Sequence, residues 1–232
     1  AGWTKKSIRK NALIKENREN IGWKMLKKDY DSLQSIFQEK LNLPLQKEIK
    51  RMYKQDQWVA FQALFTFSPN AQDRFAEKHY APDSEIRMRR LMVLMDSIGC
   101  PGEAFTGKDL WLWGIQCHHN SVSERYNAKD TLYPALRPKY LEAINRGEFS
   151  PYNFALLDEW YILVSSDGQK TAYGYIEDLQ AKEFAEAERL RKELGIRSIQ
   201  LRNRLVEIQE ETKINFYLAG EPWHSGKIEA KE

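Results

Sequence analysis

The sequence predicts an all-α fold, a helical bundle of roughly seven to nine helices in a single domain. Three observations support this prediction. Apolar residues recur at spacings of three and four over most of the chain, Gly and Pro separate these periodic stretches, and only residues 169–175 have the pattern of a small extended element. Hydrophobic residues make up 42% of the 232 residues, which is enough apolar material to bury a core.

In the first half of the chain, two long helices precede a connecting loop. Residues 23–41 place their apolar side chains on one helix face, and Pro44 fits the first turn of a helix that continues toward residue 67. Residues 68–82 contain Ser-Pro-Asn and Ala-Pro-Asp, so we expect a loop there with no more than a turn of helix. A helix over residues 84–98 follows, with Asp83 as its N-cap.

The second half of the chain continues the helical pattern. A helix is expected to begin at Thr106 or at Lys108-Asp109 and to run through Cys117. Two more are expected over residues 130–145 and 150–164, and Ser150 followed by Pro151 is a strong helix start. Two charged helices with one apolar stripe each should form an outer antiparallel pair over residues 177–194 and 198–212.

The domain prediction has three parts. Residues 1–22 are assigned to a basic N-terminal arm or short helix, and residues 23–219 to one helical domain. Residues 220–232, which contain Gly, Pro and charge and have little to bury, are assigned to a flexible tail.

Basic charge is concentrated at the N-terminal end. Residues 1–54 hold 14 Lys and Arg against 6 Asp and Glu, although the net charge of the whole chain is only +3. Such asymmetry can mark a contact with nucleic acid or an anionic surface. The lysines are interleaved with apolar residues at helical spacing, and no aromatic stacking platform accompanies them. A solvated helical face is therefore favoured, and nucleic acid is not an expected partner.

The sequence restricts the location of the protein only loosely. No apolar run approaches the roughly 18 to 20 residues that span a bilayer, so we expect a soluble protein without a membrane span. A cytoplasmic location and export after removal of a signal both stay open. The two cysteines, Cys100 and Cys117, are too few for a disulfide framework and either pair or remain free thiols.

The most suggestive cluster for metal or proton chemistry is Cys117-His118-His119. Cys and His are metal ligands, and His transfers protons near neutral pH. Adjacent side chains on a helix point about 100° apart, so these three residues cannot all bind one ion. No Cys-x-x-Cys or His-Glu-x-x-His spacing is present. We therefore expect no metal and no cofactor.

Three carboxylates could serve as acid and base if two of them faced one pocket. Asp56, Asp158 and Glu159 each lie beside large apolar residues in the sequence. The alternative is that they cap helices or pair with arginines at the margin of the core. The chain has no phosphate-binding Gly-rich loop, Gly-x-Ser-x-Gly elbow or nucleotide fingerprint, so the residues by themselves name no reaction.

A series of short motifs resembles a known family. In chain order the motifs are Asp56-Gln57, Gly99-Cys100-Pro101, Gln116-Cys117-His118-His119, Gly147-Glu148, Leu157-Asp158-Glu159-Trp160 and Tyr173-Gly174-Tyr175-Ile176. Over residues 53–176, their order and spacing are similar to those of the bacterial domain-of-unknown-function family 6624. That family has no established activity, so the resemblance implies a fold and the location of a site without a reaction.

The chain departs from the pattern of that family at polar positions. Cys117 stands where the family has His, His119 where it has Asp, and Trp160 where Arg is common. The resemblance therefore implies a polar site that this chain retains only in part.

These observations place a candidate polar site at one junction of helices, which Gly174 would let the backbone approach closely. Its residues are Asp56, Gln57, Gln116, His118, His119, Asp158, Glu159 and Tyr173. A hydrogen-bonded core network made of the same residues is the alternative.

Two classes of function stay open for this chain. A helical protein that binds an unknown small molecule or protein is favoured. The alternative is a hydrolase-like enzyme that uses His118 or His119 with a carboxylate. The oligomeric state is not predicted.

Overall fold

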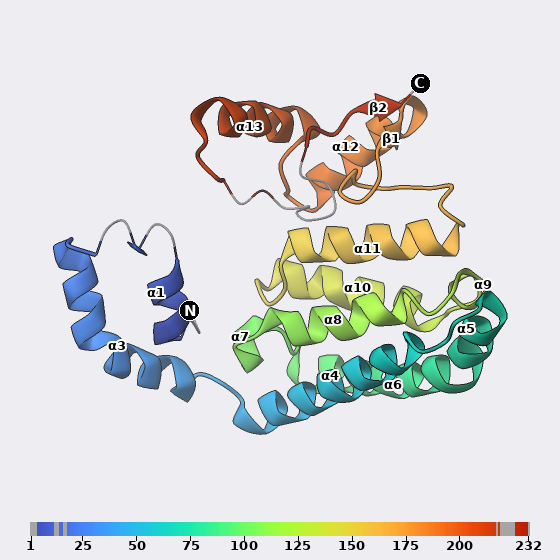
Figure 1. The fold of residues 1–232 in the computed structure, drawn as a ribbon, viewed down its shortest axis with the longest axis horizontal. Helices are drawn as coiled ribbons and strands as arrows, with labels where there is room; N and C mark the ends of the chain where they lie inside the picture. The colour runs from blue at the N-terminus through green and yellow to red at the C-terminus, as the bar shows by residue number, and fades with distance from the viewer. Residues whose placement is uncertain (1–3, 12–13, 16–17, 217, 219–225, 232) are drawn as a thin grey trace.

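The computed structural model describes residues 4–11, 14–15, 18–216, 218 and 226–231, and it confirms the all-α class. Figure 1 shows an arm, a layered helical body and a C-terminal unit. The α-helices are α1 (Lys5–Lys10), α3 (Ile21–Glu39), α4 (Leu43–Ala63), α5 (Pro69–Phe75), α6 (Ala81–Ile98), α7 (Glu103–Thr106), α8 (Asp109–His119), α9 (Glu124–Asn127), α10 (Leu132–Asn145), α11 (Pro151–Ser165), α12 (Phe184–Glu193) and α13 (Ile199–Thr212). Two strands, β1 (Leu179–Gln180) and β2 (Ala230–Lys231), form the single sheet of the described residues.

The body consists of α4, α6, α8, α10 and α11, which lie in layers (Figure 1). Helix α8 packs against α4, α6 and α11, and α10 packs against α6 and α11. Each helix buries one apolar stripe, as the periodicity predicts. The largest fully buried side chains of the shared core are Ile49, Met88, Leu91, Leu112, Ile115, Tyr133, Leu136, Tyr140 and Phe154.

Short polar residues set the starts of these helices. The Ser150 side chain accepts a hydrogen bond from the Asn153 backbone N–H, and Pro151 follows at the first turn of α11. The Asp130 carboxylate accepts the backbone N–H groups of Leu132 and Tyr133 at the start of α10. The predicted start of α11 is confirmed, and that of α10 is confirmed to within two residues.

The loop predicted over residues 68–82 is wrong, because most of this segment is helical. Ser68 caps α5, and a π-helical turn, η1 (Ala76–Tyr80), joins α5 to α6 without a break. Pro82 follows this turn, where the regular α-helical hydrogen-bond ladder is already interrupted, so its missing N–H removes less than it would in an ordinary helix. The sequence shows the prolines but not the π-turn that accommodates Pro82.

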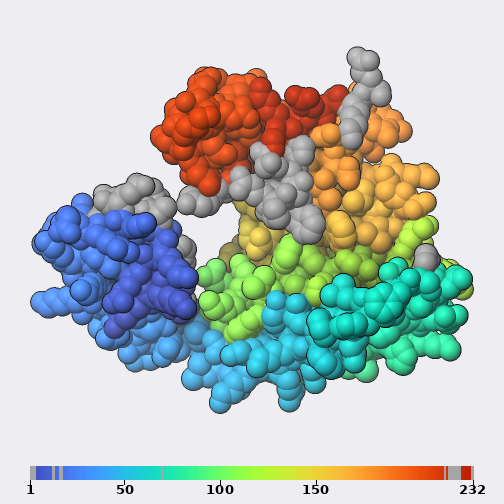
Figure 2. Space-filling view, viewed as in Figure 1, coloured from blue at the N-terminus to red at the C-terminus, as the bar shows by residue number. Residues whose placement is uncertain are grey.

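The arm extends further along the chain than residues 1–22. Helix α3 has no buried residue and forms with α1 a lobe that projects from the body (Figures 1 and 2). The arm contacts the body at its base, where Phe37 and Leu41 lie against Gly107. The boundary therefore falls near residue 40 instead of residue 22. An apolar stripe in the sequence does not tell which surface, if any, will cover it.

The helix predicted over residues 177–194 begins later than expected. Leu179 and Gln180 form β1, residues 181–183 form a 3₁₀ turn, η2 (Ala181–Glu183), and α12 starts only at Phe184. The two strands pair in parallel, with Leu179 opposite Ala230. A partner 51 residues further along the chain thus decides the local structure, and charge-rich helical periodicity cannot reveal it.

The prediction of a flexible tail over residues 220–232 is wrong for residues 226–231, and residues 220–225 and 232 lie outside the described part. Ile228 is buried, and the Asn203 side chain bonds both its N–H and its carbonyl. A single isoleucine between charged residues gives no periodic signal, so the sequence did not indicate this packing.

Helices α4 and α8 approach each other closely at Gly114. A Cβ atom on Gly114 would lie 2.7 Å from Cε2 of Tyr53, which is too short for two carbons. We expect Gly114→Ala to lower the free energy of unfolding by about 1–3 kcal/mol despite the better helix propensity of alanine. Urea denaturation measures the change. A Tyr53→Leu background should remove most of the penalty, and an equal loss in both backgrounds would contradict the close contact.

Candidate functional site

A buried carboxylate, that of Asp56, lies at the centre of a polar cluster between α4, α6 and α8. Its Oδ1 lies 3.2 Å from Nη2 of Arg87, and its Oδ2 lies 2.5 Å from Nδ1 of His118. Arg87 is also buried and pairs with Asp83 on its own helix. The carboxylate is therefore balanced by a buried cation, as an ionised group in the core requires.

His118 and Gln57 complete this cluster toward the surface. The side chain of His118 is 31% exposed, and the Gln57 amide nitrogen lies 3.3 Å from Oδ2 of Asp56 and 3.4 Å from Nδ1 of His118. When Nδ1 donates its proton to Asp56, Nε2 is the basic atom of the ring. The cluster can thus orient a partly exposed imidazole.

Neither cysteine supplies a nucleophile beside His118. Burial, together with the charge of Asp56, raises the pKa of the Cys117 thiol well above its ordinary value. Burial and the charge of Glu148 raise the pKa of Cys100 to about 12. Both cysteines are free, so both thiols keep their protons near neutral pH.

His119 points into the core, where polar side chains lie on both sides of its ring. Its Nδ1 lies 2.8 Å from Oγ of Ser84, and its Nε2 lies 3.3 Å from Oδ2 of Asp130. Ser, His and Asp in this order are the residue types of a hydrolase triad. Ser84 is completely buried, however, so a substrate carbonyl cannot reach its oxygen. The three side chains instead join α6, α8 and the start of α10.

Gln116 belongs to the core between α6 and α8. Its side chain is fully buried, and Nε2 donates to Sδ of Met88 at 3.1 Å. Tyr140 lies on its other side, and burial raises the pKa of that phenol well above its ordinary value. Gln116 therefore contributes to helix packing and faces no solvent.

A second cluster surrounds Asp158 on α11. The carboxylate accepts hydrogen bonds from the hydroxyls of Tyr133 and Tyr173, both at 2.9 Å. Arg137 donates to it from Nε at 2.9 Å and from Nη2 at 3.0 Å. Four donors use the whole acceptor capacity of a carboxylate, so Asp158 has none left for a substrate proton.

Glu159, the next residue, binds the backbone of the segment that follows α11. Its Oε1 accepts the N–H groups of Tyr173 at 3.1 Å and Gly174 at 2.7 Å, and its Oε2 accepts that of Tyr175 at 2.7 Å. The Thr171 hydroxyl also donates to Oε1. Because Glu159 is completely buried, these donors replace the water that its charge would otherwise need.

The geometry of this carboxylate-binding segment depends on Gly174. Residues 172–177 are a run of bends, and consecutive N–H groups in such a run make a cradle for an anion. Gly174 has φ of +73°, and a Cβ there would lie 2.7 Å from Cγ2 of Ile228. A side chain at this position would therefore be strained and would also collide.

Arg191 fixes the same segment from the opposite side. It is completely buried, and it donates to the carbonyl oxygens of Tyr173 at 2.6 Å and Arg197 at 2.8 Å. Its guanidinium lies 4.5 Å from the centroid of the Tyr175 ring. Glu159 and Arg191 together attach the C-terminal unit to the body.

The eight candidate residues thus form two clusters and the links between them. His119 leads to the second cluster, because Asp130 lies against its imidazole and accepts the backbone N–H of Tyr133, whose hydroxyl reaches Asp158. The first cluster contains Asp56, Gln57 and His118, and the second contains Asp158, Glu159 and Tyr173. The structure therefore matches the core-network alternative more closely than a single cavity.

The predicted site left out several partners in these clusters, namely Ser84, Arg87, Asp130, Arg137 and Arg191. For Ser84 and Arg87 a signal was available. They share helical spacing with Leu91 and Leu94, so the apolar stripe of α6 places both on its core face. No comparable pattern identifies Arg191, because its partners are backbone carbonyl groups.

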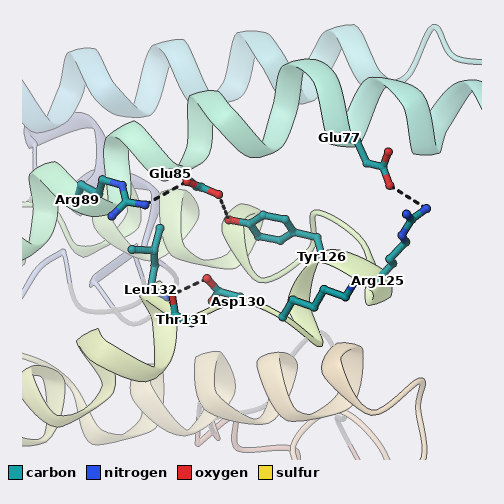
Figure 3. A pocket seen from close by; sticks show the side chains of 9 residues that line it. Glu77, Glu85, Arg89, Arg125, Tyr126, Asp130, Thr131 and Leu132 are labelled. Atoms are coloured by element: carbon teal, nitrogen blue, oxygen red, sulfur yellow. Dashed lines mark hydrogen bonds and ion pairs between the residues drawn. The ribbon is translucent and has the colours of Figure 1, made fainter.

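A pocket of about 420 Å³ lies on the outer side of Asp130 (Figure 3). Glu85 lies between Arg89 and Tyr126 in this pocket, and its Oε1 accepts the Tyr126 hydroxyl at 3.2 Å. Arg125 pairs with Glu77 on the other side. The lining has three cationic and three anionic side chains, so it presents no net charge that would select a charged ligand.

Two further observations concern metal ions and membranes. Within the described residues, no group of three or more His, Cys, Asp and Glu side chains could hold a metal ion. No helix in the same part of the chain combines the length and apolar character that crossing a bilayer requires.

Asp130 makes the stability of the fold depend on pH. Burial alone would raise the pKa of Asp130, but hydrogen bonds from His119 and from the backbone N–H groups of Leu132 and Tyr133 outweigh it and lower this pKa. The stabilisation is therefore present above the unfolded-state pKa of about 3.9 and is lost as pH falls through the folded-state value.

We expect Asp130→Asn to be less stable than the wild type by about 1–2 kcal/mol at neutral pH. The difference should shrink as pH falls below about 4 toward the lowered pKa of the folded state, because the unfolded wild-type chain then binds a proton that the folded chain does not. Urea unfolding at a series of pH values measures it. A difference that stays constant down to acidic pH would show that Asp130 does not carry this dependence.

Comparisons of the chain with protein-family models, with curated proteins and with solved structures found no match. The resemblance of the motifs to family 6624 therefore stays a prediction.

Proposed function

We propose that this chain is a non-catalytic helical protein that binds a partner protein through an aromatic face at the end of α4. The aromatic face consists of the large apolar residues Trp58, Phe61, Leu64, Phe65 and Phe67, which are between 48% and 89% exposed. Contiguous apolar surface of this kind in a soluble fold marks a site of interaction.

The arrangement of the rings supports recognition of a partner. The ring centroids of Trp58 and Phe61 lie 5.9 Å apart in a stacked pair, and those of Phe61 and Phe65 lie 5.0 Å apart edge to face. Rings that already contact one another lose little rotamer freedom on binding. At these exposures the four rings offer on the order of 500 Å² to a partner.

The charge pattern favours a protein partner. Residues 57–72 contain no Asp, Glu, Lys or Arg, although charged residues make up 30% of the chain. The cores of protein interfaces are depleted of charge and enriched in Trp and Phe. A membrane-surface helix would instead carry Lys and Arg beside its apolar face.

The polar clusters support a binding function because their buried side chains already have hydrogen-bond partners within the protein. Asp158 and Glu159 are buried and fully hydrogen-bonded, and His119 is enclosed in the core. An enzyme needs at least two such groups free toward one cavity. We infer that these residues hold the helices in register so that α4 presents a rigid surface.

The test compares wild type with a Trp58→Ser/Phe61→Ser double variant. Proteins retained from an extract of the native cells are identified, purified and titrated against both forms. Because central aromatic residues dominate interfaces, we expect a loss of affinity of at least about thirtyfold. The matched control, Ile86→Ser/Val93→Ser on α6, also changes two exposed apolar residues and should bind like wild type. Equal affinity of the aromatic-face variant and the wild type would disprove the proposal.

A second candidate function has one specific observation in its favour. The contact between Asp56 and the partly exposed His118 has the geometry of a general base. If His118 catalyses hydrolysis, His118→Gln should abolish turnover of an identified substrate and leave folding nearly intact. If it only connects helices, the same change should lower the unfolding free energy by about 1–3 kcal/mol.

A further inference from the structure

The N-terminal arm leaves most of its apolar side chains uncovered. Ile21, Met25, Leu33 and Ile36 of α3 are between 49% and 71% exposed. Beside them, an open groove of about 670 Å³ runs between α1 and α3 over mainly apolar side chains. Because a helix gains most of its stability from packing an amphipathic face, a 19-residue helix without a buried residue calls for a covering surface.

The same arm carries unbalanced positive charge. Residues 1–40 contain ten Lys and Arg against five Asp and Glu, and all ten basic side chains are exposed. Among the described residues, Lys5 pairs with the carboxylate of Asp31, and Arg18 donates to the backbone carbonyl of Arg9. The arm thus has an excess of positive charge that attracts an anionic partner.

We propose that the arm binds the surface of an anionic phospholipid bilayer. A helix with a basic polar side and an exposed aliphatic side lies in the plane of the membrane interface, with its apolar residues at the boundary of the acyl chains. Trp23 and Tyr30, which are partly exposed, are residue types that favour this interface. The arm projects from the body as a separate lobe (Figure 2).

Two other partners use only part of this surface. Nucleic acid would satisfy the lysines, but its phosphate backbone has no contact to offer four exposed aliphatic side chains. A second copy of the arm would cover the aliphatic side chains and bring the two basic clusters together, which opposes association. An anionic bilayer accommodates both features.

Co-sedimentation of the full chain with lipid vesicles tests the proposal. Wild type should sediment with phosphatidylcholine vesicles that contain phosphatidylserine and remain in solution with pure phosphatidylcholine. Lys24→Gln/Lys27→Gln/Lys28→Gln should weaken this binding roughly a hundredfold, and Met25→Ser/Ile36→Ser by at least about tenfold. The matched control, Lys182→Gln/Lys192→Gln/Lys213→Gln, removes three exposed lysines from the C-terminal unit and should bind like wild type.

The outcomes separate the possible partners. Loss of binding in both arm variants, with circular dichroism spectra and unfolding curves like those of wild type, supports the bilayer. Retention of binding by the Met25→Ser/Ile36→Ser variant would indicate a general affinity for polyanions and overturn the proposal. So would a lack of binding to the serine-containing vesicles at low salt, tighter binding to duplex DNA, or light scattering that shows a dimer dissociating in the same two variants.

Discussion

Glu159→Gln is expected to lower the free energy of unfolding by about 3–5 kcal/mol, among the largest effects of any single substitution in this chain. The carboxylate accepts backbone N–H groups of Tyr173, Gly174 and Tyr175 in a completely buried position. Glutamine has the same size but no charge, and its amide group would place N–H donors against N–H donors. At least one buried donor would thus lose its acceptor.

Urea denaturation measures this loss, and limited proteolysis should show where it occurs. We expect cleavage between α11 and α12 to accelerate in Glu159→Gln, because the segment that Glu159 holds connects these helices. Glu186→Gln is the matched control, since Glu186 is exposed and forms a surface ion pair with Arg189, which contributes less than about 1 kcal/mol. Similar unfolding energies for the two variants would contradict the role of Glu159.

The second large effect is expected for Arg87→Met. This change removes the buried cation 3.2 Å from Asp56 and leaves a carboxylate in the core without a positive partner. Breaking a buried ion pair on one side typically costs about 3–5 kcal/mol, because the remaining charge stays desolvated. Methionine fills much of the volume of arginine, so lost packing contributes little to the expected effect.

A double-mutant cycle distinguishes this explanation from a general defect of α6. Arg87→Met/Asp56→Leu should regain much of the stability lost in Arg87→Met, because no unpaired charge remains. Arg89→Met, two residues along the same helix, removes an exposed guanidinium and should change stability by less than about 1 kcal/mol. If the double variant is less stable than Arg87→Met, Asp56 is not the source of the penalty.

The proposed function and the Arg87→Met prediction are linked through α4. Asp56 lies on the inner side of this helix, and the aromatic face begins two residues later on its outer side. The cluster of Asp56, Arg87 and His118 therefore determines how α4 is oriented against α6 and α8. Variants of the aromatic face should leave the stability of this cluster unchanged, because their side chains point outward.

The candidate site was predicted only partly from the sequence. The contact between Asp56, Gln57 and His118, and the contact of Asp158 and Glu159 with residues 173–175, join motifs that the resemblance to family 6624 had already grouped. Their division into two clusters was not predicted. Motif order places residues on helices, but the side of α8 on which His118 and His119 lie depends on its partners, and adjacent residues there point into different clusters.

The sequence alone determined the all-α class and the long body helices, because apolar residues at helical spacing can be buried together only on one face of a helix. Only the tertiary structure decided the conformation and the contacts of the segments between these helices. Residues 171–175 bind around Glu159, residues 179–180 pair with residues 230–231, and Ile228 packs against Gly174. These interactions join residues far apart in the chain through single charges, backbone groups and one side chain, which leave no periodic pattern in the sequence.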